Sequence, residues 1–261
     1  MKNIWDKIIK GTAEFFKDAG FKKAVIGLSG GIDSSVVAVI AQQALGYENV
    51  TGVTMPSPYS SQGSVDDSEI LAQNLLIRLH GMSISKIMDS FNVVLEKLFY
   101  GFPVDSTEQN IQARIRAVLL MAICNKYHAL LLNTCNKSEE YTGYCTLYGD
   151  SCGAVAPIGD LYKTDVYKLA KWINEQPDLP DIPEVIINKA PSAELSHGQK
   201  DEDDLPSYDV LDPILGKYVD AKWREEDFIL MGYDKDIVEK VVELIKSSEF
   251  KRKQSPPVIK V

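Results

Sequence analysis

The sequence lacks the long apolar run that a membrane-spanning segment requires. Its longest run, Ala117 to Cys124, is far shorter than the roughly 18–20 residues of a membrane helix. Charges are scattered over residues 1–16, so this segment has no apolar signal-peptide core. We therefore expect a cytoplasmic protein that does not contact a membrane.

Cysteine and histidine are scarce and are not spaced as metal ligands. The sequence has four cysteines and three histidines, and no two cysteines form a CxxC pair. The spacing of Cys135, Cys145 and Cys152 fits no common zinc pattern. We expect these thiols to be free, like that of Cys124.

Basic residues are outnumbered, which disfavours binding to nucleic acid. Lys and Arg total 28 against 37 Asp and Glu, a formal net charge of −9. Affinity for a phosphate backbone rests on clustered Lys and Arg. The sequence therefore predicts no nucleic-acid partner. Its 261 residues, 45% hydrophobic and 25% charged, are typical of a globular chain, and we expect one domain over residues 1–261.

Short apolar runs alternate with helical patterns in the first half of the chain. Runs at 24–28, 50–55, 83–87 and 129–133 predict strands. The segments that predict helices are 3–18, 34–45, 63–79, 89–99, 110–127, 164–172, 207–219, 224–231 and 234–246. Such alternation is typical of a doubly wound, Rossmann-like α/β fold with a parallel sheet and helices on both faces.

A glycine-rich turn, Ser29 to Ser35, follows the first strand and opens the next helix. Adjacent glycines permit a positive φ and close approach of an anion, and the helix N-terminus adds partial positive charge. The turn therefore predicts a phosphate cradle, the alternative being a plain strand–helix turn capped by Asp33 or Ser34. The sequence has no GxxxxGK[ST] loop. Because the carboxylate of Asp33 would repel phosphate without a bridging cation, it predicts Mg²⁺.

The letters of this turn, SGGIDSS, resemble the SGGxDS signature of the ATP pyrophosphatase (PP-loop) enzymes. That resemblance implies cleavage of ATP between its α- and β-phosphates and transfer of AMP to an oxygen atom of the substrate. NAD, GMP, asparagine and argininosuccinate synthetases and tRNA-modifying enzymes share the signature. The signature alone does not choose among them.

Further segments resemble the NAD synthetases in order and spacing, and the resemblance extends from about residue 4 to residue 261. These segments are EQNIQARIR at 108–116, NTCNKSE at 133–139, YCTLYGD at 144–150, PIGDLYKT at 157–164, PSAEL at 191–195, 199–206, and KRKQ at 251–254. The resemblance implies that ATP adenylates deamido-NAD and that ammonia displaces AMP. The products would be NAD⁺, AMP and pyrophosphate, in the last step of NAD biosynthesis. It also implies Mg²⁺, ATP as co-substrate, and a homodimer with deamido-NAD bound across the two-fold interface.

The resemblance also implies roles for individual residues. Asp33 and Glu139 would bind Mg²⁺, and Asp33 and Lys163 would be catalytic, with Lys163 balancing phosphate charge during AMP transfer. Arg114 and Lys251 would bind deamido-NAD. The residues implied to bind ATP are Gly27, Leu28, Ser29, Gly30, Gly31, Ile32, Asp33, Ser34, Thr134, Lys163 and Ser192.

Three positions depart from the ammonia-dependent NAD synthetases. Leu147, Ala154 and Phe250 stand where those enzymes carry Lys, an acidic residue and His, respectively. The motifs look more like the synthetase domain of glutamine-dependent enzymes, yet 261 residues leave no room for a glutaminase with its own nucleophile. We therefore expect an ammonia-using synthetase with a glutamine-type substrate pocket.

Two segments outside the regular pattern carry further expectations. Residues 190–207 include the acidic run 201–204 and read either as a solvated loop or, by resemblance, as a lid that keeps water from an acyl-adenylate. Residues 248–261 form a basic tail that we expect to fold back onto the site. The alternatives to an NAD synthetase are another PP-loop synthetase and a nucleotide-binding module without catalysis.

Overall fold

The computed structural model describes all 261 residues and contains one sheet of four parallel strands. The strands run in the order β3-β2-β1-β4, with Ala24 of β1 opposite Val50 of β2 and Leu130 of β4. Their bounds are β1 Lys23–Gly27, β2 Val50–Thr54, β3 Arg78–Gly81 and β4 Ala129–Leu131. The predicted parallel α/β fold is confirmed.

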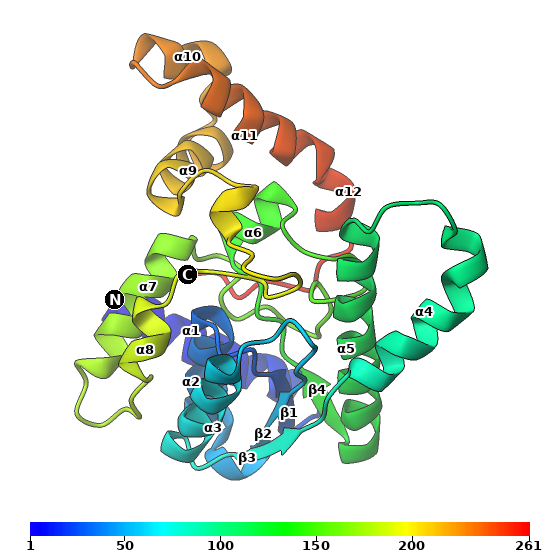
Figure 1. The fold of residues 1–261 in the computed structure, drawn as a ribbon. Coiled ribbons are helices and arrows are strands. Elements are labelled where there is room, and N and C mark those ends of the chain that lie inside the picture. Colours follow the sequence, from blue (N-terminus) through cyan, green and yellow to red (C-terminus); the bar gives the residue numbers. More distant parts are fainter.

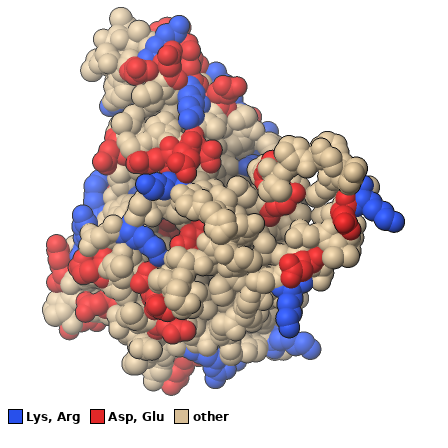
Figure 2. Space-filling model, viewed as in Figure 1, with Lys and Arg blue, Asp and Glu red and all other residues tan.

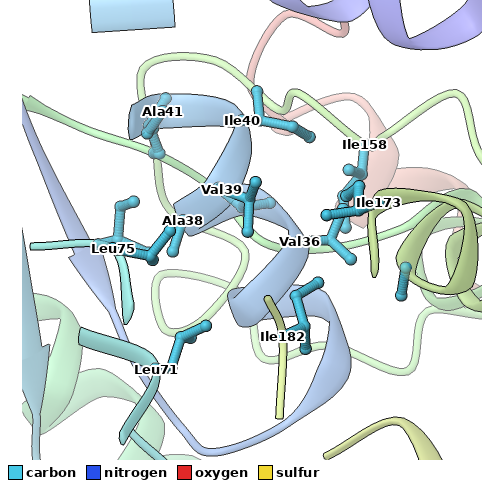
Figure 3. Close-up of a cluster of buried hydrophobic side chains, with 14 of the residues drawn as sticks. Val36, Ala38, Val39, Ile40, Ala41, Leu71, Leu75, Ile158, Ile173 and Ile182 are labelled. Carbon is cyan, nitrogen blue, oxygen red and sulfur yellow. The ribbon is translucent and has the colours of Figure 1, made fainter. Parts of the chain in front are cut away.

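Helices cover both faces of this sheet (Figure 1). Ala24 and Ile26 pack with α1, α2, α3 and α7 on one face, whereas Val25, the residue between them, packs with α5 on the other. This division follows from the alternation of side chains along a strand. Figure 3 shows residues of α2, α3 and α7 interlocked on the first face. The bounds are α1 Lys2–Asp18, α2 Ile32–Leu45, α3 Gln62–Asn74, α4 Ser85–Phe99, α5 Ser106–Tyr127 and α7 Lys163–Asn174.

A helical lobe with its own apolar core stands beyond the sheet (Figure 1). Leu211, Ile214, Phe228, Val238 and Val241 are the centre of this core. The lobe consists of α9 Tyr208–Leu215, a π-helical turn Gly216–Asp220, α10 Glu225–Leu230 and α11 Lys235–Ser247. The short helices α6 Lys137–Thr142, α8 Glu184–Asn188 and α12 Glu249–Arg252 complete the chain.

The third strand lies earlier than the sequence predicts. The expected strand at 83–87 is wrong, because α4 already begins at Ser85, and the expected helix at 63–79 ends early, at Asn74. Leu76 has a left-handed backbone with φ of 55°, which turns the chain out of α3 and into β3. A leucine rarely adopts this conformation, so its sequence gives no turn signal.

Three further features concern the helices and the surface. None of the helices is both long and apolar enough to cross a membrane. On the face drawn in Figure 2, Lys and Arg are scattered among Asp and Glu and form no continuous patch. Helix α4 has no buried residue.

Candidate active site

The glycine turn lies at the carboxyl end of β1 and leads into α2. Gly30 has φ of 74°, and a Cβ added there would lie 2.7 Å from the Cα of Ser64. Only glycine fits such a close approach to another backbone segment. The hydroxyl of Ser34 donates to the carbonyl of Gly31 at 3.1 Å and so ties the turn to the first turn of α2. The backbone N–H groups are therefore held at the N-terminus of a 14-residue helix, where anions are favoured.

A lysine and two carboxylates form the charged centre beside this turn. The Nζ atom of Lys163 contacts the carboxylate of Asp33 and lies 3.3 Å from Oε1 of Glu139. The Nδ2 atom of Asn136 donates to Oδ1 of Asp33 at 2.9 Å. Asp33, Glu139 and Lys163, three residues implied by the resemblance, thus come together from α2, α6 and α7.

Hydrogen bonds among α6, α7 and α9 position this centre. Asn136 and Glu139 form a reciprocal capping box at the start of α6. The hydroxyl of Ser138 accepts from the N–H of Lys163 at 2.9 Å and donates to Asp212 at 2.6 Å. These bonds join the start of α7 to α6 and to the helical lobe. They therefore fix the backbone position of Lys163.

The electrostatics of the centre favour cations. Burial, together with the negative charge of Asp33, raises the pKa of Glu139 to about 8, against the opposing effect of Lys163. Burial alone would lower the pKa of Lys163, but the Asp33 and Glu139 carboxylates outweigh it and raise that pKa. Lys163, with only 3% of its surface exposed, therefore stays an ammonium. Burial also raises the pKa of the nearby Asp201 carboxyl.

The donor set suits magnesium rather than a transition metal. The structure contains no cluster of three or more His, Cys, Asp or Glu side chains arranged around a metal position. Asp33 and Glu139 supply two carboxylates that share one buried ammonium. Mg²⁺ is commonly bound through one or two carboxylates plus substrate phosphates and water. The residues present fit that manner of binding.

A cavity of about 270 Å³ opens beside the charged centre. Its lining includes every residue for which an ATP or Mg²⁺ contact was predicted, from Gly27–Ser34 through Thr134, Glu139 and Lys163 to Ser192. Clustering of these segments in one cavity is compatible with the predicted roles, which remain predictions.

The two residues predicted to contact deamido-NAD lie outside this cavity. The Nε atom of Arg114 donates to the carbonyl of Leu147 at 3.1 Å. The Nζ atom of Lys251 donates to the carbonyls of Gly143 and Cys145, both at 2.7 Å. Both cations thus brace residues 143–147, a segment that borders the cavity at Tyr144. Leu147, Ala154 and Phe250 also lie outside its lining.

The segments predicted to be a lid and a returning tail have defined positions. Residues 190–195 and Asp201 line the cavity, and the N–H of Asp201 donates to the carbonyl of Pro191 at 3.1 Å. In the tail, Val258 forms a parallel bridge with Ala156. Movement of the first segment and a binding role for the second stay predictions.

Five charged residues line the cavity without a role predicted from the sequence: Arg116, Asp150, Lys189, Glu194 and Asp201. Glu194 accepts from the hydroxyls of Ser61 and Ser64 at 3.0 and 2.7 Å, and Lys189 lies 3.1 Å from Asp67. Arg116 and Glu194 belong to motifs already noted, EQNIQARIR and PSAEL. Their membership in those motifs could have marked them as candidate site residues, but a motif does not show which side chains face the cavity.

Comparison with curated proteins reveals close relatives along the whole chain. A model of the NAD synthase family matches residues 4–255. Glutamine-dependent NAD(+) synthetases of Synechocystis sp. and Thermotoga maritima are each 47% identical over 260 residues. The matches cover 100% of this chain but 46% and 45% of those proteins, so the chain spans less than half the length of these relatives.

Solved structures give similar matches. A glutamine-dependent NAD+ synthetase from Acinetobacter baumannii is 40% identical, with a TM-score of 0.70, and the match covers 99% of this chain and 46% of that one. An NMN synthetase from Francisella tularensis is 28% identical, with a TM-score of 0.82. An NH3-dependent NAD synthetase from Campylobacter jejuni is 29% identical, with a TM-score of 0.77; both of these matches cover 96% of this chain and 95% of the other. With its fold, its glycine turn and its motifs in one cavity, the chain belongs to the NAD synthase family.

Proposed function

We propose that the chain catalyses ATP-dependent amidation of deamido-NAD with ammonia, through an NAD-adenylate, giving NAD⁺, AMP and pyrophosphate. The observation that carries this proposal is the contact of Lys163 with Asp33 and Glu139 beside the glycine turn. It combines an anion cradle with a cation centre in one cavity. Transfer of AMP brings anionic groups together, so a site of this composition lowers its barrier electrostatically.

In the first step a nicotinate carboxylate oxygen attacks the α-phosphorus of ATP. The bond from that phosphorus to the bridging oxygen breaks, and pyrophosphate leaves with the electron pair. The N–H groups of Gly30–Ser34 and the ammonium of Lys163, all in the cavity lining, would stabilise the charge that develops on the phosphates. Asp33 and Glu139 hold Lys163 in position for this role.

Asp33 and Glu139 would also hold Mg²⁺, which supplies further positive charge to the phosphates when bound. Their carboxylates are the only predicted metal ligands in the cavity. Because a carboxylate inside a phosphate cradle is otherwise repulsive, Asp33 is useful there only with cations beside it: Lys163 in the structure and Mg²⁺ by this proposal.

In the second step ammonia attacks the adenylated carbonyl carbon. The bond from carbon to the AMP oxygen breaks, AMP leaves, and a proton from the nitrogen passes to solvent or buffer. Water would compete with ammonia for the same carbon. Residues 190–195 and Asp201 line the cavity and would exclude water if they close over the substrates.

We propose free ammonia as the nitrogen source for the chain as given. Burial raises the pKa of the Cys124 thiol to about 11, and a hydrogen bond with Cys145 and burial raise that of Cys135 well above its usual range. Thiols held in the protonated form are poor nucleophiles. Neither is therefore suited to release ammonia from glutamine.

We further propose a homodimer built on α4. This helix has no buried residue, and its apolar side chains continue into the following loop. The exposed apolar residues are Phe91, Val93, Val94, Leu98, Tyr100, Phe102 and Val104. An apolar surface of this extent marks an interaction site, and a second copy of the chain would cover it. Sedimentation at micromolar concentration should give twice the mass of one chain, and Val94→Glu should shift it to one; a stable monomer of the unsubstituted chain contradicts the dimer.

The function is tested by comparing nitrogen donors and acceptors side by side. The purified chain is incubated with ATP, Mg²⁺ and deamido-NAD, with either ammonium or glutamine, and NAD⁺ is measured. Ammonium should support turnover and glutamine almost none. A parallel reaction with nicotinic acid mononucleotide tests the alternative raised by the NMN synthetase neighbour. Faster amidation of that shorter acid would overturn deamido-NAD as the substrate.

A further inference from the structure

Arg116 is a cavity-lining cation whose outer nitrogens have no protein partner. It lies on α5, half-buried, and its Nε atom donates to the carbonyl of Met55 at 3.1 Å. Neither of its Nη atoms takes part in a hydrogen bond or ion pair within the chain. Four of the five N–H donors of the guanidinium are therefore left without a protein acceptor.

The other cations of the cavity are compensated. Lys163 contacts Asp33 and Glu139, and Lys189 lies 3.1 Å from Asp67 and 2.6 Å from the hydroxyl of Ser64. Burial lowers the pKa of Arg116, and the opposing negative charges, Asp150 and Glu194, form no ion pair with it. A partly buried charge without a counter-ion costs free energy, and an incoming anion would recover that cost.

The contact with Met55 places the guanidinium at the sheet edge where the glycine turn opens. Met55 directly follows β2, and β2 lies beside β1 in parallel. The carboxyl ends of both strands therefore meet at one edge, which is where open α/β sheets bind ligands. With Nε held by the carbonyl, the fork of Nη donors suits a planar, two-point contact with an anion.

We propose that Arg116 binds an anionic oxygen of a substrate in this cavity, either a phosphate of ATP or an anionic group of deamido-NAD. The identities of these two ligands rest on the proposed function. Arg114, two residues earlier, does not line the cavity. It is exposed, and its Nε atom donates to the carbonyl of Leu147.

Equilibrium binding of ATP with Mg²⁺, and separately of deamido-NAD, tests this role in four proteins: the unsubstituted chain, Arg116→Met, Arg116→Lys and Arg78→Met. Arg78 is exposed on β3 and controls for the loss of one positive charge. Arg116→Met should raise the Kd of one ligand at least tenfold, a change of about 1.4 kcal/mol. Arg116→Lys should raise the same Kd by a smaller factor, and Arg78→Met should change neither. The ligand that is affected identifies the anion.

Unchanged Kd values for both ligands in a folded Arg116→Met protein would overturn the proposal. Should that variant fail to melt cooperatively, Arg116→Lys decides, because it retains the charge and loses the fork; unchanged binding there also overturns it. NAD⁺ formation by the unsubstituted chain is measured in parallel. Its absence contradicts the proposed function, while the binding comparison still tests Arg116.

Discussion

Lys163 and Arg116 are two cations in one cavity with opposite surroundings. Lys163 is almost fully buried and contacts the carboxylates of Asp33 and Glu139. Arg116 is half-buried and donates only to the carbonyl of Met55. The protein thus supplies the counter-ions of Lys163, whereas it supplies none in contact with Arg116, for which we propose an anion of a substrate.

Because the two cations differ in their ion partners, substitutions at Lys163 and Arg116 should differ in their effect on protein stability. Removal of one partner from a buried ion pair leaves an uncompensated charge and destabilises a protein by roughly 3–5 kcal/mol. Removal of an unpaired cation relieves such a charge. Substitutions at the two positions should therefore affect folding in different ways, although both should impair activity.

Loss of Lys163 is expected to have the largest effect. Lys163→Met removes the ammonium that contacts Asp33 and Glu139, so the melting temperature should fall, and turnover should drop about a hundredfold or more. Lys171→Met, at an exposed position of the same helix, is the matched control and should change neither. Thermal melting and NAD⁺ formation are the measurements. Near-normal turnover in a folded Lys163→Met protein would remove Lys163 from the mechanism.

Asp33→Asn should come next, with most activity lost and the fold retained, because the carboxylate of Glu139 still faces Lys163. The substitution keeps an oxygen that accepts from Asn136 but removes the charge needed beside Lys163 and Mg²⁺. Turnover should fall at least tenfold, corresponding to about 1.4 kcal/mol, while Asp66→Asn, at an exposed position of α3, should be neutral. More than a tenth of normal turnover at saturating Mg²⁺ would argue against the metal role.

Lys251→Met should have a moderate effect limited to substrate binding. Lys251 donates to the carbonyls of Gly143 and Cys145, so its loss would loosen the segment beside the cavity. We expect the KM for deamido-NAD to rise about tenfold, because the loss of charge-assisted hydrogen bonds has an effect of this size. Lys253→Met, exposed two residues later, controls for charge. A point substitution is preferable to removal of the tail, because Ile259 and Val261 pack against the main core. Identical kinetics in both variants would exclude a role for the tail lysine.

The smallest expected effect is that of Arg116→Met on folding. Because Arg116 has no ion partner in the chain, its replacement should leave the melting temperature unchanged or slightly raised. Urea denaturation of this variant beside Lys163→Met compares the two cations directly. Equal loss of unfolding free energy in Arg116→Met and Lys163→Met would contradict the claim that only Lys163 is stabilised by ion partners within the chain.

Most of the sheet could be predicted from local patterns, and β3 shows where those patterns fail. The strands predicted at 24–28 and 129–133 are apolar runs next to clear turn signals. The structure has β1 there, shifted by one residue, and β4, which is two residues shorter than predicted. Strand β3, RLHG, is only partly buried and alternates weakly. The turn before it depends on Leu76, whose left-handed backbone is accompanied by the hydrogen bonds that end α3, such as that from the N–H of Ile77 to the carbonyl of Ala72, and does not follow from residue preference.

The candidate site was predictable where a motif carries the chemistry and not where tertiary packing does. Asp33, Glu139 and Lys163 were expected together, and the structure joins them. Arg116 and Asp201 become cavity residues only after α5 and the irregular segment after Pro191 are folded around the turn. A motif match does not show which side chains of α5 or of the segment after Pro191 face the cavity.

The most direct test of the account follows the oxygen atoms of the reaction. Deamido-NAD with a heavy-oxygen label in its nicotinate carboxylate is incubated with the chain, ATP, Mg²⁺ and ammonium, and the nucleotide products are separated and weighed by mass spectrometry. If the cavity transfers AMP to the carboxylate, AMP and pyrophosphate form in equal amounts with NAD⁺, and the label is found in the phosphate of AMP. Formation of ADP as the main nucleotide product, or AMP without label, would contradict the proposed adenylate.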